Sequence, residues 1–375
     1  MDNKLLLSIA IPTYNRAANL KNLLDCIVPQ AEKFKGEVEI CISNNSSTDN
    51  TREVVADFIK KYPDLIKYNE NKENLGIVRN ILEVVEMSSG GFIWTLGDDD
   101  LVVDNGFKKV IDFIKNYYNE NIGLITFASR TYFVDNKTGE EVVSCNTIEK
   151  DKSSVYEINR KDIIGQHFPD STFISVLLYN NNFLNKILKE EKIIIEKAIE
   201  AKDYIHTFIY RLMFLKYPQL QALRFNEKII DQELPHYKVY IEDIFQLHHT
   251  IPIKLADLLL SSKYASDYYR EIIIDSNKGI TKKIIVEMGT IRAFKPFNCF
   301  SFFGCFKMFF QQATFIDALL FSIFFVIFSI IPPVVLKNLY KVLLKIKFKK
   351  EWKKKWPTAT VADSMSSKSS RRLMS

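Results

Sequence analysis

Short apolar runs alternate with amphipathic stretches over roughly the first 135 residues of the chain. The runs "LLLSIAIP", "EVEICIS", "LIKY", "GFIWTLG" and "GLITFASRTYF" each have the length of a single strand. The segments between them place apolar residues three and four positions apart, as "STDNTREVVADFIKKY" does after its capping residues. Strands that alternate with helices predict an α/β fold with a doubly wound, mostly parallel, Rossmann-like sheet.

Polar residues gather directly after several of these predicted strands. The segments "PTYNR", "SNNSSTDNT" and "GDDD" all occupy such positions. Ligands of doubly wound sheets bind at the carboxyl ends of the strands, so we expect these three segments to form one site.

The pattern is looser after residue 135. "VDNKTGEEV" is typical of a hairpin turn, "TFISVLLY" of a strand and "DYIHTFIYRLMFLKY" of a mostly apolar helix. Residues 236–295 favour a small, polar, helical accessory region. We therefore expect a first domain over residues 1–235, with one half over 1–110 and a second half over 111–235.

Composition changes from Pro296 onward. Residues 318–336 are nineteen residues without a charge, and the following "KNLYKVLLKIKFKKEWKKKW" mixes apolar residues with lysine. Spanning a bilayer takes about 20 apolar residues, and this run also contains Pro332 and Pro333. We predict that 296–357 associates with a membrane through an in-plane or re-entrant element and a basic amphipathic helix. The alternative is a buried helix with a solvated lysine tail, and 358–375 is Ser-rich, which favours disorder.

The basic charge of the chain is concentrated at its end. From Lys337 onward the net charge is +10, which leaves the first 336 residues at −4 because the whole chain carries +6. This distribution argues against a nucleic-acid partner for the folded part. The five cysteines have no metal-ligand spacing and indicate reduced thiols, and the N-terminus lacks the pattern of a signal peptide.

Three consecutive carboxylates, Asp98, Asp99 and Asp100, end an apolar run. Like charges this close are costly unless a cation binds, and Mg²⁺ or Mn²⁺ prefers carboxylate and phosphate oxygens. The alternative is an acidic loop at the start of the next helix. Similarly, "SNNSSTDNT" could bind a base or ribose or simply cap a helix, and Arg79 could reach a phosphate or be solvated.

Taken together and in this order, these segments resemble a known family. "LSIAIPTYNR", "ISNNSSTDNT", "KENLGIVRN" and "WTLGDDD" are similar to the nucleotide-sugar-binding half of family 2 glycosyltransferases with the GT-A fold. The resemblance extends to bacterial O-antigen and capsule transferases of the abequosyltransferase kind. It covers about the first 110 residues, and it implies that 1–110 is the nucleotide-sugar half of the domain and 111–235 the acceptor half.

The resemblance implies a role for particular residues. Asp99 falls on the metal-binding acid of the family's DxD-type motif, whose preceding acid is replaced by Gly97. Asn45 stands where the family usually has an Asp. Asp203, at a predicted helix start, matches the general base in place, with Glu242 and Asp243 as rivals. The implied catalytic residues are Asp203 and His206; the implied nucleotide-sugar-binding residues are Pro12, Thr13, Tyr14, Arg16, Asn45, Asp49, Arg79 and Asp98; the implied metal ligands are Asp99, Asp100 and His236.

The expected function follows from this resemblance. The chain would be a metal-assisted glycosyltransferase, using Mn²⁺ or Mg²⁺, that moves a sugar from a nucleotide-diphosphate donor to a lipid-linked glycan with inversion by an Asp base. It would act at the cytoplasmic face of the bacterial inner membrane as a peripheral or monotopic protein. The alternatives are a non-catalytic nucleotide-sugar-binding scaffold and a sugar nucleotidyltransferase, although the latter normally has a Gly-rich loop after its first strand.

Overall fold

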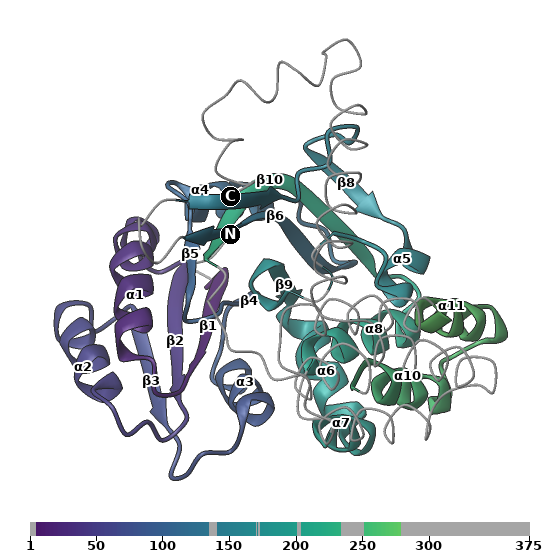
Figure 1. Cartoon of the computed structure of the whole chain (residues 1–375), viewed down its shortest axis with the longest axis horizontal. Helices are drawn as coiled ribbons and strands as arrows, with labels where there is room; N and C mark the ends of the chain where they lie inside the picture. The colour runs from purple at the N-terminus through teal and green to yellow at the C-terminus, as the bar shows by residue number, and fades with distance from the viewer. Residues whose placement is uncertain are drawn as a thin grey trace, which may run out of the picture. The chain divides into compact units, whose positions relative to one another are not determined.

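The computed structural model describes residues 5–134, 141–169, 171, 173–200, 204–233 and 251–278. Within them, ten strands form one sheet in the order β3-β2-β1-β4-β9-β6-β10-β5, with β7 paired to β6 and β8 to β10 (Figure 1). The strands are β1 (Leu7–Thr13), β2 (Val38–Asn44), β3 (Ile66–Glu70), β4 (Phe92–Thr95), β5 (Asp100–Val102), β6 (Ile122–Val134), β7 (Glu141–Asn146), β8 (Val155–Ile158), β9 (Leu177–Asn180) and β10 (Gln221–Glu233).

Four parallel strands, β3, β2, β1 and β4, make up the N-terminal half of the sheet. Strands β1 and β2 are almost entirely buried, as expected for central strands with helices on both faces. The helices of this half are α1 (Ala17–Ala31), α2 (Thr51–Lys61) and α3 (Ile77–Glu86). In Figure 1, α1 and α2 lie on one side of these strands and α3 on the other. The prediction of alternating strands and helices is confirmed here.

The second half of the sheet is mixed, which corrects the expectation of a mostly parallel sheet. Strand β9 runs antiparallel to both β4 and β6, and β10 is parallel to β6 but antiparallel to β5 and β8. A parallel neighbour needs a crossover connection, whereas β7 follows β6 after a short connection and pairs with it as an antiparallel strand. Strands β5, β8 and β9 are only three or four residues long, which is too short for a clear pattern in the sequence.

The sheet is curled, and the connection from β4 to β5 requires this. These two strands are separated in the sheet by β9, β6 and β10, a distance of roughly 19 Å if the sheet were flat. The five residue steps from Thr95 to Asp100 reach about 17 Å at most when fully extended. They are not extended, because the Asp100 amide donates to the Gly97 carbonyl at 3.3 Å. Curling therefore brings β5 next to α1 and places the acidic segment at the turn.

A cluster of aromatic rings lies behind this turn. Trp94 is fully buried, with its ring centroid 5.7 Å from that of Phe107 and 5.2 Å from that of Phe127. Phe107 belongs to α4 (Gly106–Tyr117), and Trp94 Nε1 donates to the Ser175 carbonyl at 2.8 Å. The position of Ser175, in the short 3₁₀ turn η2 (Ile174–Val176), is thus fixed by the core.

The remaining helices pack around the second half of the sheet. They are α5 (Arg160–Gly165), α6 (Asn181–Glu190), α7 (Lys192–Ile199), α8 (Ile205–Lys216), α10 (Ile251–Ser261) and α11 (Asp267–Lys278). Helix α8 is the predicted apolar helix and is almost wholly buried, while α10 contacts α7 and α8 and α11 contacts α5.

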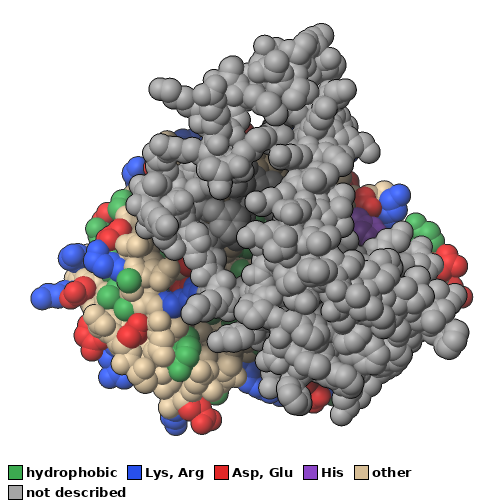
Figure 2. Space-filling view, viewed as in Figure 1, with side chains coloured by type: hydrophobic (Ala, Val, Ile, Leu, Met, Phe, Trp, Pro, Cys, Tyr) green, Lys and Arg blue, Asp and Glu red, His purple; other side chains and the backbone are tan. Residues whose placement is uncertain are grey.

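The membrane-associating segment 296–357 and the tail 358–375 lie outside the described residues. Among the helices that the structure describes, none combines the length and the apolar character needed to cross a bilayer. On the face seen in Figure 2, acidic and basic side chains are interspersed over the N-terminal half.

Candidate active site

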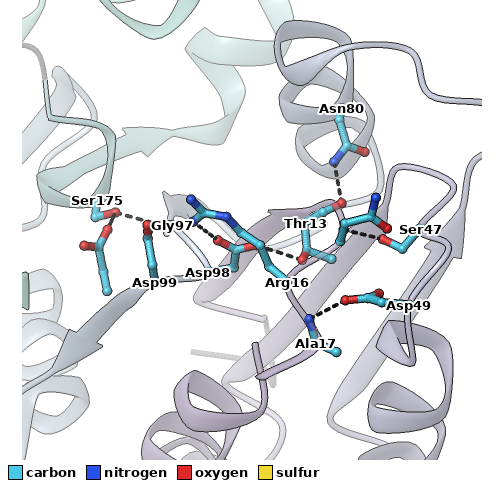
Figure 3. Close-up of polar contacts among 12 residues, drawn as sticks. Thr13, Arg16, Ala17, Ser47, Asp49, Asn80, Gly97, Asp98, Asp99 and Ser175 are labelled. Carbon is cyan, nitrogen blue, oxygen red and sulfur yellow. Dashed lines mark hydrogen bonds and ion pairs between the residues drawn. The ribbon is translucent and has the colours of Figure 1, made fainter. Parts of the chain in front are cut away.

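The three polar segments expected to form one site do meet at the carboxyl ends of β1, β2 and β4. The Asn45 amide donates to the Thr13 carbonyl at 2.9 Å, which joins the first two segments. Thr13 Oγ1 donates to Asp98 Oδ2 at 2.7 Å, which joins the first and third (Figure 3). The predicted meeting of "PTYNR", "SNNSSTDNT" and "GDDD" is therefore present in the fold.

Asp98 is held by two neighbours. Besides the bond from Thr13, its Oδ1 accepts from an Arg16 guanidinium nitrogen at 2.9 Å. The carboxyl is nearly buried, and burial raises its pKa above the usual value despite the opposing effects of Arg16 and Thr13. Asp98 therefore fixes the turn to β1 more than it offers free oxygens.

Asp99 is the most accessible of the three acids. Its side chain is 31% exposed, against 7% for Asp98, and its Oδ2 lies 2.6 Å from the same Arg16 nitrogen. Although burial opposes it, the attraction of Asp98 and Asp99 raises the pKa of Arg16 above its usual value. The single positive charge of Arg16 thus offsets part of the negative charge of two carboxylates, Asp98 and Asp99.

Asp100 has a different environment. It begins β5 with its side chain buried, where one carboxylate oxygen accepts a hydrogen bond from Ser175 Oγ and Oδ1 has no hydrogen-bond partner. Burial raises the pKa of Asp100 to about 8, with Asp99 and Asp98 adding to the shift. The three acids therefore do not converge, and the described residues contain no group of three or more His, Cys, Asp or Glu that could hold a metal.

Gly97 has a steric reason for lacking a side chain. A Cβ at this position would lie 2.6 Å from Asp100 Oδ2 and 3.3 Å from Ser175 Oγ. Carbon and oxygen atoms do not approach this closely without displacement, so a side chain here would push the Asp100 carboxylate out of place.

The second loop is organised by asparagine side chains. Asn45 Oδ1 accepts from the Leu75 amide at 2.9 Å and from Asn71 Nδ2 at 3.1 Å, and Asn45 is buried. Asn80 Nδ2 donates to the Ser43 carbonyl at 3.0 Å and to the Thr13 carbonyl at 3.4 Å. These contacts tie α3 and the 71–75 loop to the ends of β1 and β2.

Asp49 caps the start of α1 from the second loop. Its Oδ2 accepts from the Ala17 amide at 2.9 Å, and Oδ1 accepts from the Thr51 amide and hydroxyl. Although its partial burial acts in the opposite direction, the hydrogen bonds from Thr51 and Ala17 lower the pKa of Asp49. The side chain is therefore engaged in positioning the "PTYNR" segment.

The other predicted residues are spread around this centre. Pro12 lies in β1, and Tyr14 is 41% exposed beside it. Arg79 lies in the first turn of α3 after Gly76, whose φ is +82°, and it pairs with Glu196 of α7 at 2.7 Å. His206 is buried in the first turn of α8. Asp203, Glu242, Asp243 and His236 lie outside the described residues.

Ser175 and Asn80 are site residues that the sequence did not single out. Asn80 lies in the "NLGIVRN" segment, directly after Arg79, and this position is the feature of the sequence that points to it. Ser175 is 75 residues from Asp100, and only the antiparallel placement of β9 beside β4 brings them together.

Comparison with known proteins places this geometry in a family. The model of "Glycosyl transferase family 2" matches residues 8–177, which contain every element of the centre described above. Residues 8–177 are thus similar to a family 2 glycosyltransferase domain. The match ends at β9, so α6 and all later elements lie beyond it.

Individual relatives agree with this assignment. The chain is 45% identical over 96 residues to an abequosyltransferase of Salmonella typhimurium, covering 26% of this chain and 28% of that protein. It is 28% identical over 214 residues to the GalNAc(5)-diNAcBac-PP-undecaprenol beta-1,3-glucosyltransferase of Campylobacter jejuni, covering 55% and 64%. The chain thus spans less than two thirds of either relative's length. Among solved structures, residues 1–349 of S. aureus TarS share the fold, with a TM-score of 0.56, 15% identity and coverage of 82% of this chain and 80% of that one.

Proposed function

We propose that this chain is a metal-assisted glycosyltransferase of bacterial surface polysaccharide biosynthesis. It would move a sugar from a nucleotide-diphosphate sugar to a lipid-linked oligosaccharide. The observation that carries the proposal is Asp99, an accessible carboxylate beside Arg16, at the carboxyl ends of parallel strands within a family 2 domain. This is where open α/β sheets bind nucleotides.

The donor would bind along the ends of β1 and β2. Tyr14 offers an exposed ring to the base, and the backbone of Pro12 and Thr13 lies directly before it. Asn45 would contribute to base or ribose recognition through the loop it organises. TarS has been solved with UDP-GlcNAc, and a mannosyltransferase of Pyrobaculum calidifontis with GDP-Man and Mn²⁺, so this fold accommodates such donors.

A divalent cation fits the donor set around Asp99. Hard cations bind through one or two carboxylates and complete their shell with phosphate oxygens and water. Asp99 would supply a carboxylate, with Asp98 beside it, while Asp100 is too deeply buried to serve without rearrangement. When bound, Mn²⁺ or Mg²⁺ would stabilise the negative charge that develops on the departing nucleoside diphosphate.

Arg16 has two possible partners in this scheme. Its guanidinium balances Asp98 and Asp99 in the ligand-free protein, and it is also suited to contact diphosphate oxygens in a two-pronged way. With a metal and a diphosphate bound, Asp99 would help to hold the metal and Arg16 would contact the phosphate. Arg79 would have to leave Glu196 to make a similar contact.

The acceptor would approach from the α8 side. Asp203 is our candidate for the base that takes the acceptor hydroxyl's proton, two residues before α8 begins at Ile205. His206 would shape its surroundings. The glucosyltransferase relative has PP-undecaprenol in its name, and the segment 296–357, which is lysine-rich from Lys337 onward, would keep this chain at a membrane surface.

A panel of donors tests this proposal. The full chain is incubated with UDP-, GDP-, CDP- and dTDP-sugars, with Mn²⁺ or with EDTA, and release of the nucleoside diphosphate is measured. We expect release from one donor class, in the presence of metal, and faster release when a lipid-linked acceptor is added. If donors bind but neither hydrolysis nor transfer occurs under any condition, the scaffold alternative is supported instead.

A further inference from the structure

One serine hydroxyl holds both ends of the acidic turn. Ser175 Oγ accepts a hydrogen bond from the Gly97 amide at 2.8 Å and donates one to the Asp100 carboxylate (Figure 3). Ser175 is fully buried, so water does not compete for these bonds. Asp99 lies between the two anchored residues.

The hydroxyl itself is held in place by the core. The Ser175 carbonyl accepts from Trp94 Nε1 at 2.8 Å, and the Ile174 carbonyl accepts from Thr95 Oγ1 at 3.2 Å. Both donors belong to β4, immediately before the acidic turn. The η2 segment therefore contacts the turn and the strand leading into it, and its position depends on the packing of the Trp94 ring.

The absence of a side chain at Gly97 belongs to the same arrangement. A Cβ there would lie 2.6 Å from Asp100 Oδ2, so glycine leaves the space that the carboxylate uses to reach Ser175. Asp99 Oδ1 would be 3.2 Å from the same Cβ, which shows how closely the turn is folded around this point. A small displacement of the turn would therefore move Asp99.

We propose that Ser175 is a positioning residue for the metal site, which fixes Gly97 and Asp100 so that the Asp99 carboxylate stands toward the donor. This inference rests on the proposed function, because it assigns Ser175 to the cation that Asp99 would bind. Ser175 does not touch the cation. Groups that orient a metal-binding carboxylate without contacting the metal commonly change metal affinity about 10- to 100-fold when removed.

Asp100 has a corresponding role under this proposal. It serves as the hydrogen-bond acceptor that receives Ser175, and Asp99 alone faces the cation. Replacement of Asp100 by asparagine keeps an oxygen for Ser175 and removes only the charge. A ligand role for Asp100 and a positioning role thus lead to opposite results for the same variant.

The first test measures the turn without any ligand. Amide hydrogen exchange is followed by mass spectrometry in peptides that cover residues 96–102, in the full chain and in Ser175→Ala. Loss of the hydroxyl should speed exchange in these peptides. The matched control is Ser88→Ala, which removes a buried serine hydroxyl that donates to the Val84 carbonyl just after the end of α3. Unchanged exchange in Ser175→Ala would overturn the proposal, whether or not the protein binds metal.

The second test measures Mn²⁺ binding directly. Free Mn²⁺ is followed by electron paramagnetic resonance while the full chain is titrated, alone and with UDP or GDP. We expect Ser175→Ala to weaken Mn²⁺ binding about 10-fold or more. Asp100→Asn and Ser88→Ala should stay within about threefold of wild type, and Asp99→Asn should abolish binding.

The outcomes separate this inference from the function on which it rests. Wild-type Mn²⁺ affinity in Ser175→Ala, with faster exchange at the turn, would show that the hydroxyl holds the turn without serving the metal, and would overturn the positioning role. Loss of binding in Asp100→Asn would make Asp100 a ligand and overturn it as well. A wild-type protein that binds no Mn²⁺ would instead overturn the metal site in the proposed function, and Ser175's role with it.

Discussion

Two buried carboxylate networks lie at opposite ends of the same parallel strands. At the amino ends, Glu39 of β2 accepts from Ser8 Oγ at 2.6 Å and from the Ser89 amide at 2.7 Å, and pairs with Lys67 at 2.6 Å. At the carboxyl ends, Arg16 pairs with Asp98 and Asp99, while Thr13 donates to Asp98 and Ser175 donates to Asp100. The Glu39 network lies within the strands, whereas the acidic turn follows β4 and leaves Asp99 partly exposed.

The two networks differ in how completely their oxygens are satisfied. Both Glu39 oxygens have partners, and although burial opposes it, the bonds from Lys67, Ser8 and Ser89 lower the pKa of Glu39. Asp100 keeps one oxygen without a partner, and burial raises its pKa to about 8. A buried acid whose oxygens are all bonded stabilises a fold, whereas buried acids with raised pKa values cluster at functional sites.

The largest expected effect is a loss of sugar transfer when the acidic turn is changed and not when the Glu39 network is changed. Asp99→Asn should lower sugar transfer at least about 100-fold because the developing diphosphate charge loses its cation. Glu39→Gln should leave transfer near wild type while lowering the free energy of unfolding. Steady-state kinetics and urea unfolding of both variants provide the comparison. Equal loss of activity in Asp99→Asn and Glu39→Gln would contradict the different roles of the two networks.

Gly97 and Gly90 differ in what an added side chain would meet, one near each network. A Cβ at Gly97 would meet the Asp100 side chain, whereas a Cβ at Gly90 would lie 2.6 Å from the backbone nitrogen of Ser8. Gly97→Ala should therefore cost transfer activity, about 10-fold or more, with a modest loss of stability. Gly90→Ala should cost about 1–3 kcal/mol in stability, because backbone cannot move aside, and leave kcat nearly unchanged in the folded fraction.

The free energy of unfolding should depend on pH with opposite signs for Glu39, at the amino ends of the strands, and for Asp100, at their carboxyl ends. Folding lowers the pKa of Glu39. Its contribution to the free energy of unfolding is therefore fully present above the pKa of the unfolded chain, and it is lost as the pH falls through the pKa of the folded protein. The Asp100 pKa is raised from 3.8 to about 8, so stability falls as pH rises between these values. Between pH 5 and pH 8 without metal, the free energy of unfolding of Asp100→Asn should rise relative to that of wild type by on the order of 2–4 kcal/mol. A constant difference across this range would contradict the assigned burial of the charge.

The smallest expected effects concern the ion pair between Arg79 and Glu196. Both side chains are largely exposed, so Arg79→Ala and Glu196→Ala should each change stability by less than about 1 kcal/mol. If Arg79 also reaches the diphosphate, only Arg79→Ala should raise the KM for the donor. An equal KM in both variants would confine Arg79 to the surface pair.

The sequence predicted the parallel half of the fold well and the mixed half less completely. Strands β1 and β2 are continuous buried apolar runs, and α1 to α3 show clear helical spacing, so local pattern was sufficient. Strands β5 and β9 are three and four residues long, and their partners come from distant parts of the chain. Such pairings are decided by tertiary packing, which periodicity does not contain.

The same limit applied to the site. The position of "GDDD" after a strand was enough to predict that this segment meets "PTYNR". The burial of Asp100 was not predictable, because it depends on Ser175, which arrives through β9. Adjacent acids in a sequence look equivalent until the fold gives each of them a different neighbour.

The most direct test of the central claim is calorimetric titration of UDP, GDP, CDP and dTDP into the full chain with Mn²⁺, with EDTA, and in the Asp99→Asn variant. We expect one nucleotide to bind with Mn²⁺, to bind at least about 10-fold more weakly with EDTA, and to lose this metal dependence in Asp99→Asn. Nucleotide binding that is equally tight with EDTA, or metal dependence that survives in Asp99→Asn, would contradict the assignment of the acidic turn as a metal-diphosphate site.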